Sequence, residues 1–106
     1  MGHAGVPELA QSMKLEWSDE ALADLDRFAE FLDREHPSLA AIVATEIIDK
    51  VRVLPEHPQL GRPIAGREEY RQIVLQVLGA AYVFQYRFDS QSLVMLRVYR
   101  ARESRE

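Results

Sequence analysis

The chain has 106 residues, of which 47% are hydrophobic and 28% are charged, and its formal net charge is −4. This length allows one domain, and this composition is typical of globular proteins rather than of disordered or membrane-spanning chains. The lack of cysteine excludes disulfide bonds, thiolate metal sites and cysteine nucleophiles, and since no apolar run approaches the ~20 residues of a bilayer span, we expect no membrane contact and a cytoplasmic location.

The first residues of the chain show no pattern that predicts structure. Residues 1–12 hold two glycines and a proline without periodicity, and a second methionine, Met13, follows them. We expect residues 1–12 to be a disordered extension, either native or added for expression, and residues 13–106 to form the single domain. Polar and apolar side chains alternate over residues 14–17, which predicts a short strand at the start of that domain.

Two amphipathic helices are predicted next. Ser18 can cap a helix over residues 18–35, in which apolar side chains recur every three or four positions and the outer face is acidic. Pro37 disfavours helical geometry at the residue before it, and Ser38 can cap a second helix that ends near residue 54. Because the turn between them is so short, the two helices must pack antiparallel as a hairpin.

A loop dense in turn residues follows over 58–66, and after it the hydrophobic period changes from helical to strand-like. Residues 70–78, 82–88 and 93–99 are predicted to be three strands joined by tight turns. The predicted fold is therefore α+β with the order βααβββ, in which the helical hairpin packs on one face of a small antiparallel-rich sheet.

Conventional catalytic groupings are missing from the sequence. Its three histidines, His3, His36 and His57, have no metal-ligand spacing, and no glycine-rich phosphate loop follows a strand. The carboxylates of the first helix sit mostly on its outer face, where no apolar pocket would raise a pKa, so a solvated surface is the favoured interpretation. These carboxylates belong to Asp19, Glu20, Asp24, Asp26, Glu30 and Asp33. We expect no metal and no cofactor.

Charge is distributed unevenly along the chain. Residues 1–60 hold 5 Lys and Arg against 12 Asp and Glu, whereas residues 61–106 hold 8 arginines against 5 acidic residues. Arginine suits the bidentate recognition of carboxylate or phosphate, so the second half is where we expect a partner to dock, with salt bridges to the acidic helices as the alternative. The arginines are Arg62, Arg67, Arg71, Arg87, Arg97, Arg100, Arg102 and Arg105.

A series of short motifs follows the predicted elements in order. In the helical half they are Trp17-Ser18, Ala21, Asp24-Leu25 and Leu54, followed by Pro58 and Gly61-Arg62. In the strands they are Arg71, Tyr82, Tyr86 and the final Val98-Tyr99-Arg100-Ala101-Arg102. In this order and spacing, over nearly all of residues 14–102, the chain resembles the RelE/ParE superfamily of bacterial toxin–antitoxin systems.

The resemblance implies the same βααβββ fold and a cognate antitoxin, usually encoded beside the toxin, whose extended or helical tail wraps it. It also implies one of two activities. RelE-like members cleave messenger RNA in the ribosomal A site without a metal, whereas ParE-like members have no nuclease activity and inhibit DNA gyrase. Toxin–antitoxin systems of this kind serve in plasmid stabilisation.

Physical arguments favour the ParE-like branch. A nuclease that works among ribosomal RNA phosphates needs a large positive surface, and this chain carries a net charge of −4. RelE-like members tend to place a catalytic arginine where Val83 follows Tyr82 here, and they use a C-terminal aromatic residue that this chain lacks. The ParE-like pattern often ends the last strand with His-Gly-Arg. This chain has Arg100-Ala101-Arg102 there instead, and this difference leaves the choice of target open.

We therefore expect a protein that acts by binding and is not an enzyme, with DNA gyrase as its target and without sequence-specific nucleic-acid binding. The residues expected to contact the target are Arg97, Tyr99, Arg100, Arg102 and Arg105. Exposed apolar surface on the helical hairpin or a sheet edge should take the antitoxin. One alternative is a metal-independent, ribosome-dependent mRNA endoribonuclease that uses Arg71, Tyr86, Arg87 and Arg102. A second alternative is a non-toxic scaffold that only binds its antitoxin.

Overall fold

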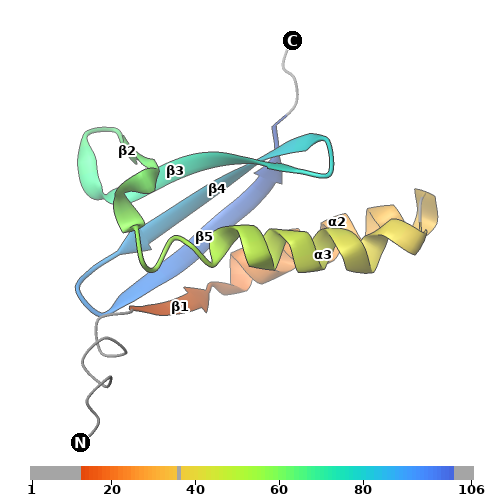
Figure 1. The fold of residues 1–106 in the computed structure, drawn as a ribbon, viewed down its shortest axis with the longest axis horizontal. Coiled ribbons are helices and arrows are strands. Elements are labelled where there is room, and N and C mark those ends of the chain that lie inside the picture. The colour runs from red at the N-terminus through yellow and green to blue at the C-terminus, as the bar shows by residue number, and fades with distance from the viewer. Residues whose placement is uncertain (1–12, 36, 102–106) are drawn as a thin grey trace, which may run out of the picture.

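A computed structural model describes residues 13–35 and 37–101 of the chain (Figure 1). The expected extension over residues 1–12 lies outside the described residues, as do Arg102 and Arg105. The described elements are β1 (Lys14–Trp17), α2 (Asp19–Glu35), α3 (Pro37–Val51), a 3-10 turn (Pro58–Leu60), β2 (Arg62–Ile64), β3 (Arg67–Val77), β4 (Ala80–Phe88) and β5 (Ser92–Arg100).

The predicted α+β class and the βααβββ order are confirmed, with one strand added. The five strands form one sheet in the order β1-β5-β4-β3-β2, in which β1 runs parallel to β5 and every other pair is antiparallel. Strand β2 lies in the segment that the sequence analysis assigned entirely to a loop. A three-residue strand at a sheet edge is too short for its hydrophobic period to be read from sequence.

Both ends of the second helix, α3, differ from the prediction. Helix α3 begins at Pro37, because a proline suits the first helical turn, where its missing N–H has no partner to lose. It ends at Val51 rather than near residue 54, and hydrogen-bonded turns follow, such as Leu54 N–H to the Val51 carbonyl at 3.0 Å. Pro55 disfavours helical geometry at Leu54, which explains the earlier end.

The two helices lie side by side across one face of the sheet (Figure 1). The core fills the space between the helices and the sheet. The alternation predicted for β3 is confirmed, since Ile73, Leu75 and Val77 pack on the side of the sheet that faces the helices. Its largest fully buried side chains are Tyr86, Phe84, Ile47, Leu54, Leu93 and Met95. No helix among residues 13–35 and 37–101 is long and apolar enough to cross a membrane.

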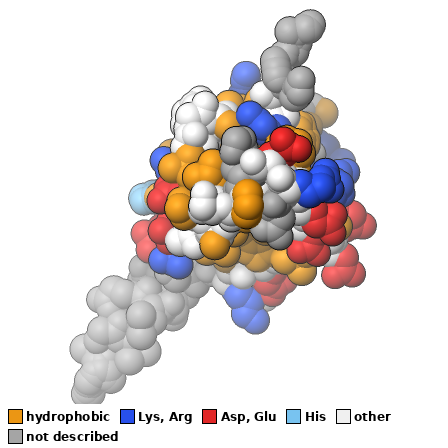
Figure 2. Space-filling model, turned by 90° about the vertical axis from the view of Figure 1, so that its right-hand side faces the viewer, with side chains coloured by type: hydrophobic (Ala, Val, Ile, Leu, Met, Phe, Trp, Pro, Cys, Tyr) orange, Lys and Arg blue, Asp and Glu red, His pale blue; other side chains and the backbone are white. Residues whose placement is uncertain are grey.

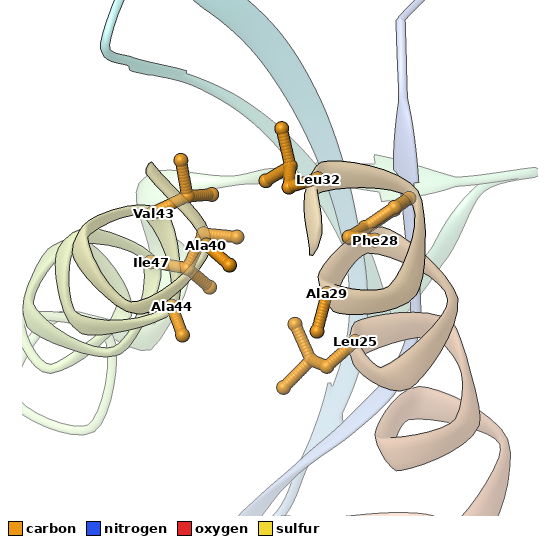
Figure 3. A pocket seen from close by; sticks show the side chains of 8 residues that line it. All are labelled: Leu25, Phe28, Ala29, Leu32, Ala40, Val43, Ala44 and Ile47. Atoms are coloured by element: carbon orange, nitrogen blue, oxygen red, sulfur yellow. The ribbon is translucent and has the colours of Figure 1, made fainter. Parts of the chain in front are cut away.

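The helices face each other through small and branched apolar side chains (Figure 3). Between them lies an apolar cavity of about 20 Å³, which is too small for a ligand and whose described walls offer no polar side chain to bind one. Its walls are Leu25, Phe28, Ala29 and Leu32 from α2, and Ala40, Val43, Ala44 and Ile47 from α3. The hairpin is thus a packed layer of the core, and any binding site must lie on its outside.

Candidate functional site

Asp24, which the sequence analysis placed on a solvated helix face, is buried, with a relative exposure of 0%. One oxygen of its carboxylate accepts hydrogen bonds from Arg97 Nε and from the Val98 backbone N–H, each at 2.8 Å. The other oxygen accepts from Arg97 Nη2 at 3.0 Å and from Arg27. The prediction for Asp24 was wrong because helical periodicity alone does not show which polar side chain meets a strand.

The reason for this burial lies in the short first strand. Strand β1 ends at Trp17, opposite Met95, so the rest of β5 has no described strand beside it on that edge. Helix α2 begins there instead, with the Ser18 N–H bonded to the Met95 carbonyl at 2.9 Å and the Ser18 hydroxyl to the Leu96 carbonyl at 3.0 Å. Six residues after Ser18, Asp24 accepts the Val98 N–H, as a carbonyl of a neighbouring strand would do.

The surroundings of Asp24 also decide its charge. Burial alone would raise the pKa of this carboxyl group, but the hydrogen bonds from Arg97, the Val98 N–H and Arg27 hold the pKa below its ordinary value. Asp24 is therefore ionised at neutral pH. Arg97, one of the residues expected to face the target, is tied to this carboxylate, although its side chain remains 47% exposed.

Arg71 and Tyr86 lie side by side in the β3–β4 pairing and together hold the segment that leads into β2. The Arg71 guanidinium donates to the carbonyls of Gly61 at 2.8 Å and Gln59 at 3.2 Å. It also donates to the Glu68 carbonyl at 2.8 Å and pairs with the Glu68 carboxylate. Its side chain is only 7% exposed, so these backbone acceptors take the place of water.

Tyr86 completes this attachment from inside the core. Its hydroxyl donates to the Pro58 carbonyl at 2.6 Å and accepts the Gly61 N–H at 2.9 Å. Gly61 is required here, since a Cβ at this position would lie 2.7 Å from the Tyr86 hydroxyl and 2.8 Å from the Gln72 carbonyl oxygen. Burial raises the pKa of Tyr86, although the Gly61 N–H and nearby Arg71 lower it in part, so the phenol keeps its proton.

Replacing Tyr86 with phenylalanine should lower the stability of the fold by about 2 kcal/mol, because the buried Gly61 N–H would lose its acceptor. In a domain of this size that loss corresponds to a fall in melting temperature of roughly 10 °C, which thermal unfolding measures. Tyr99→Phe is the matched control, since the Tyr99 hydroxyl is exposed and its one hydrogen bond within the described residues comes from Gln85. Equal melting temperatures for the two variants would contradict the role given to Tyr86.

The four residues named for a ribonuclease do not converge on one open site. Arg71 and Tyr86 are brought together, but both are buried on the helix-facing side of the sheet. Arg87 follows Tyr86 in the same strand and therefore points to the opposite face. Arg102 lies outside the described residues. Within the described chain, no cluster of three or more His, Cys, Asp or Glu side chains could hold a metal ion.

The end of β5 presents side chains on both faces of the sheet. Tyr99 is 39% exposed on the face without helices, where its hydroxyl accepts a 3.2 Å hydrogen bond from the Gln85 amide. Arg100 is exposed on the helix-facing side, since it pairs in register with Tyr82 and comes two positions after buried Val98. The described residues among those expected to contact the target are therefore divided between the two faces, with Tyr99 on one and Arg100 on the other.

An apolar groove lies beside Arg100, between the α2–α3 turn and the β3–β4 turn. It has a volume of about 320 Å³, and among the described residues that line it Arg100 is the single charged one. Phe31 is 45% exposed and Leu78 is 55% exposed at its margins. The other lining residues are Leu32, Leu39, Val43, Val77, Ala80 and Tyr82. Figure 2 looks onto this end of the molecule and shows hydrophobic side chains gathered there, with acidic side chains to one side.

Comparisons with known proteins agree with this architecture. Residues 15–105 match the family model described as the ParE toxin of the type II toxin–antitoxin system parDE. The protein Y4kP of Sinorhizobium fredii, named as a candidate toxin, is 32% identical over 91 residues, which are 85% of this chain and 90% of that protein. A structure of the chromosomal ParDE system from P. aeruginosa has the same fold, with a TM-score of 0.71 and 23% identity over 87% of this chain and 99% of that one.

Proposed function

Because the chain belongs to the ParE toxin family of type II toxin–antitoxin systems, we propose that it inhibits DNA gyrase by binding to it and that a cognate antitoxin neutralises it in the cytoplasm. The observation that carries the proposal is the burial of Arg71 and Tyr86, which direct their donors to the backbone. The chain instead exposes an apolar groove and a strand end with tyrosine and arginine, the features by which proteins grip one another.

The end of β5 is the surface that we assign to the target. Tyr99 and Arg100 are exposed there, and tyrosine and arginine are the residue types that most often dominate the binding energy of interfaces. Arg97 adds the exposed part of its side chain, and Arg102 and Arg105 continue the same stretch of sequence. A basic strand end of this kind suits an acidic surface on the target.

The groove beside Arg100 is the surface that we assign to the antitoxin. Its described walls are apolar and include Arg100, so an apolar segment that carries a carboxylate fits it. Because Arg100 belongs to both surfaces, an antitoxin seated in the groove covers part of the target contact. Neutralisation then follows from competition for Arg100.

Arg100→Ala and Tyr99→Ala should each raise the toxin concentration that traps gyrase on cleaved DNA by about tenfold, the typical effect of removing one important contact. The measurement is the yield of cleaved DNA from purified gyrase as the toxin is titrated. Arg67→Ala is the control, since Arg67 is an exposed arginine at the start of β3, remote from the β5 end. If all three variants act alike, the β5 end is not the target surface.

The function itself is tested by inducing the chain in cells with separate readouts of replication and translation. The expected result is that DNA synthesis stops while translation continues and ribosome-bound message stays intact. Message cut at the ribosomal A site would support a ribonuclease and overturn the proposal. Normal growth on induction, together with tight binding to the antitoxin, would identify a non-toxic scaffold and overturn it as well.

A further inference from the structure

Strand β3 is much longer than the strand that covers its outer edge (Figure 1). Strand β2 pairs with β3 only as far as Gln72. Beyond that point Ile73–Val77 pairs with β4 on one side, and no described strand lies on the other. Five consecutive residues of an interior strand therefore form an open sheet edge.

The turn at the end of β3 determines which backbone groups are open. Leu78 and Gly79 have positive φ values of 51° and 87°, which is the geometry of a two-residue type I′ turn between Val77 and Ala80. The residues that flank such a turn exchange hydrogen bonds with each other, and the pattern alternates from there along the strand. The N–H and C=O groups of Val74 and Gln76 therefore point away from β4.

This edge lacks the features that protect the other outer strands of the sheet. Strand β1 has only four residues and carries Lys14 and Glu16. Strand β2 has three residues, contains Pro63 and is interrupted by a bulge after it. The edge over residues 73–77 has no charge, no proline and no bulge, and the Val74 side chain is 52% exposed. An uncharged edge without a proline or a bulge can accept an added strand.

We propose that an extended segment of the antitoxin pairs with the open edge of β3 and becomes a sixth strand of the sheet. This inference rests on the proposed function, because it needs an antitoxin. Backbone hydrogen bonds from Val74 and Gln76 would hold the added strand. Uncharged side chains of the antitoxin segment would pack beside Val74 on the helix-free face of the sheet.

The extent of the edge decides between an antitoxin and a second copy of this chain. Five strand residues span about 17 Å, far too little surface for a stable interface, which needs roughly 800 Å² from each partner. Two copies joined only along this edge would not stay together. The groove begins where the edge ends, since Val77 and Leu78 line it, so one partner can fill the groove and continue along β3.

Val74→Pro tests the inference because the outward N–H of Val74 makes no bond to β4. A proline there removes this donor and blocks strand addition while the ladder to β4 remains. Val74→Thr is the matched control, since threonine is also β-branched and keeps the donor. We expect Val74→Pro, and independently Gln76→Pro, to bind the antitoxin encoded beside the chain's own gene at least tenfold more weakly, and Val74→Thr to bind it as the unchanged chain does.

Amide hydrogen exchange tests the same point in the unchanged chain, without any substitution. The amides of Val74 and Gln76 should exchange quickly in the isolated chain and become protected in the complex, whereas the Leu75 amide should be protected in both. Fast exchange at Val74 and Gln76 in the complex, or undiminished binding by both folded proline variants, would overturn the inference.

Phe31→Asp, a substitution in the groove away from the β3 edge, separates this inference from the proposed function. If Phe31→Asp weakens binding while both proline variants bind normally, the antitoxin uses the groove alone and the added strand is wrong. If the unchanged chain forms no complex with that antitoxin, both the added strand and the proposal that this antitoxin neutralises the chain are wrong.

Discussion

Asp24→Ala should destabilise the protein by about 3 kcal/mol, because it removes a buried acceptor and leaves the Val98 N–H without a partner. The same carboxylate connects α2 to the part of β5 that no strand covers, so its loss separates two layers of the fold. For a domain of this size we expect the melting temperature to fall by roughly 12–24 °C in thermal unfolding.

Two other substitutions on the same helix show whether the cause is the buried carboxylate. Asp24→Asn keeps an oxygen that can accept the Val98 N–H but loses the charge, so its effect should lie between those of the alanine variant and the unchanged chain. Asp26→Ala removes an exposed acid and should change the melting temperature little. A loss from Asp26→Ala as large as that from Asp24→Ala would show that helix charge, not the contact with β5, is responsible.

The same residue gives the fold a pH dependence of known sign. The pKa of Asp24 is lower in the folded chain than in the unfolded one, so the folded state favours the ionised carboxylate. Its contribution is complete above the unfolded pKa of about 4 and is lost as the pH falls through the folded pKa. The difference in unfolding free energy between the unchanged chain and Asp24→Asn should therefore narrow below about pH 4. A difference that stays constant there would contradict the stabilising role given to ionised Asp24.

Arg71→Met should destabilise the protein by about 3 kcal/mol, because the buried carbonyl group of Gly61 and the more exposed one of Gln59 would lose a charged donor. Methionine keeps most of the length and apolar volume of the arginine stem, so the loss reports on hydrogen bonding more than on packing. We expect a lower melting temperature and faster proteolysis of the segment over residues 58–61, which Arg71 holds in place.

Arg67→Met is the control for this prediction, because Arg67 lies in the same strand with its side chain exposed. The measurement also separates the two roles considered for Arg71. If Arg71→Met unfolds at the same temperature as the unchanged chain but abolishes cleavage of ribosome-bound RNA, Arg71 is a catalytic residue and the binding mechanism is wrong. A stability loss without any RNA cleavage in the unchanged chain supports the positioning role.

The signals that predicted the fold are local in the sequence. The helices are predicted because apolar residues recur with helical spacing, because Ser18 and Ser38 are candidate caps and because Pro37 ends the first helix, although α3 begins at Pro37 itself. Strands β3, β4 and β5 are predicted by their alternation and by the turn residues between them, whereas β2 is not. The order of these elements was then enough to predict a helical hairpin on one face of a sheet, which the structure confirms.

The sequence by itself thus determined the elements and the α+β architecture, because the period of a pattern depends only on neighbouring residues. Only the tertiary structure decided which polar side chains are buried and which groups they bind. Asp24 is buried because its acceptors are filled by residues 73 and 74 positions away, and Arg71 because it reaches the carbonyl of a residue 10 positions back across the sheet. No pattern within a helix or strand records such partners, so the charges that look solvated in the sequence are partly the ones that hold the fold together.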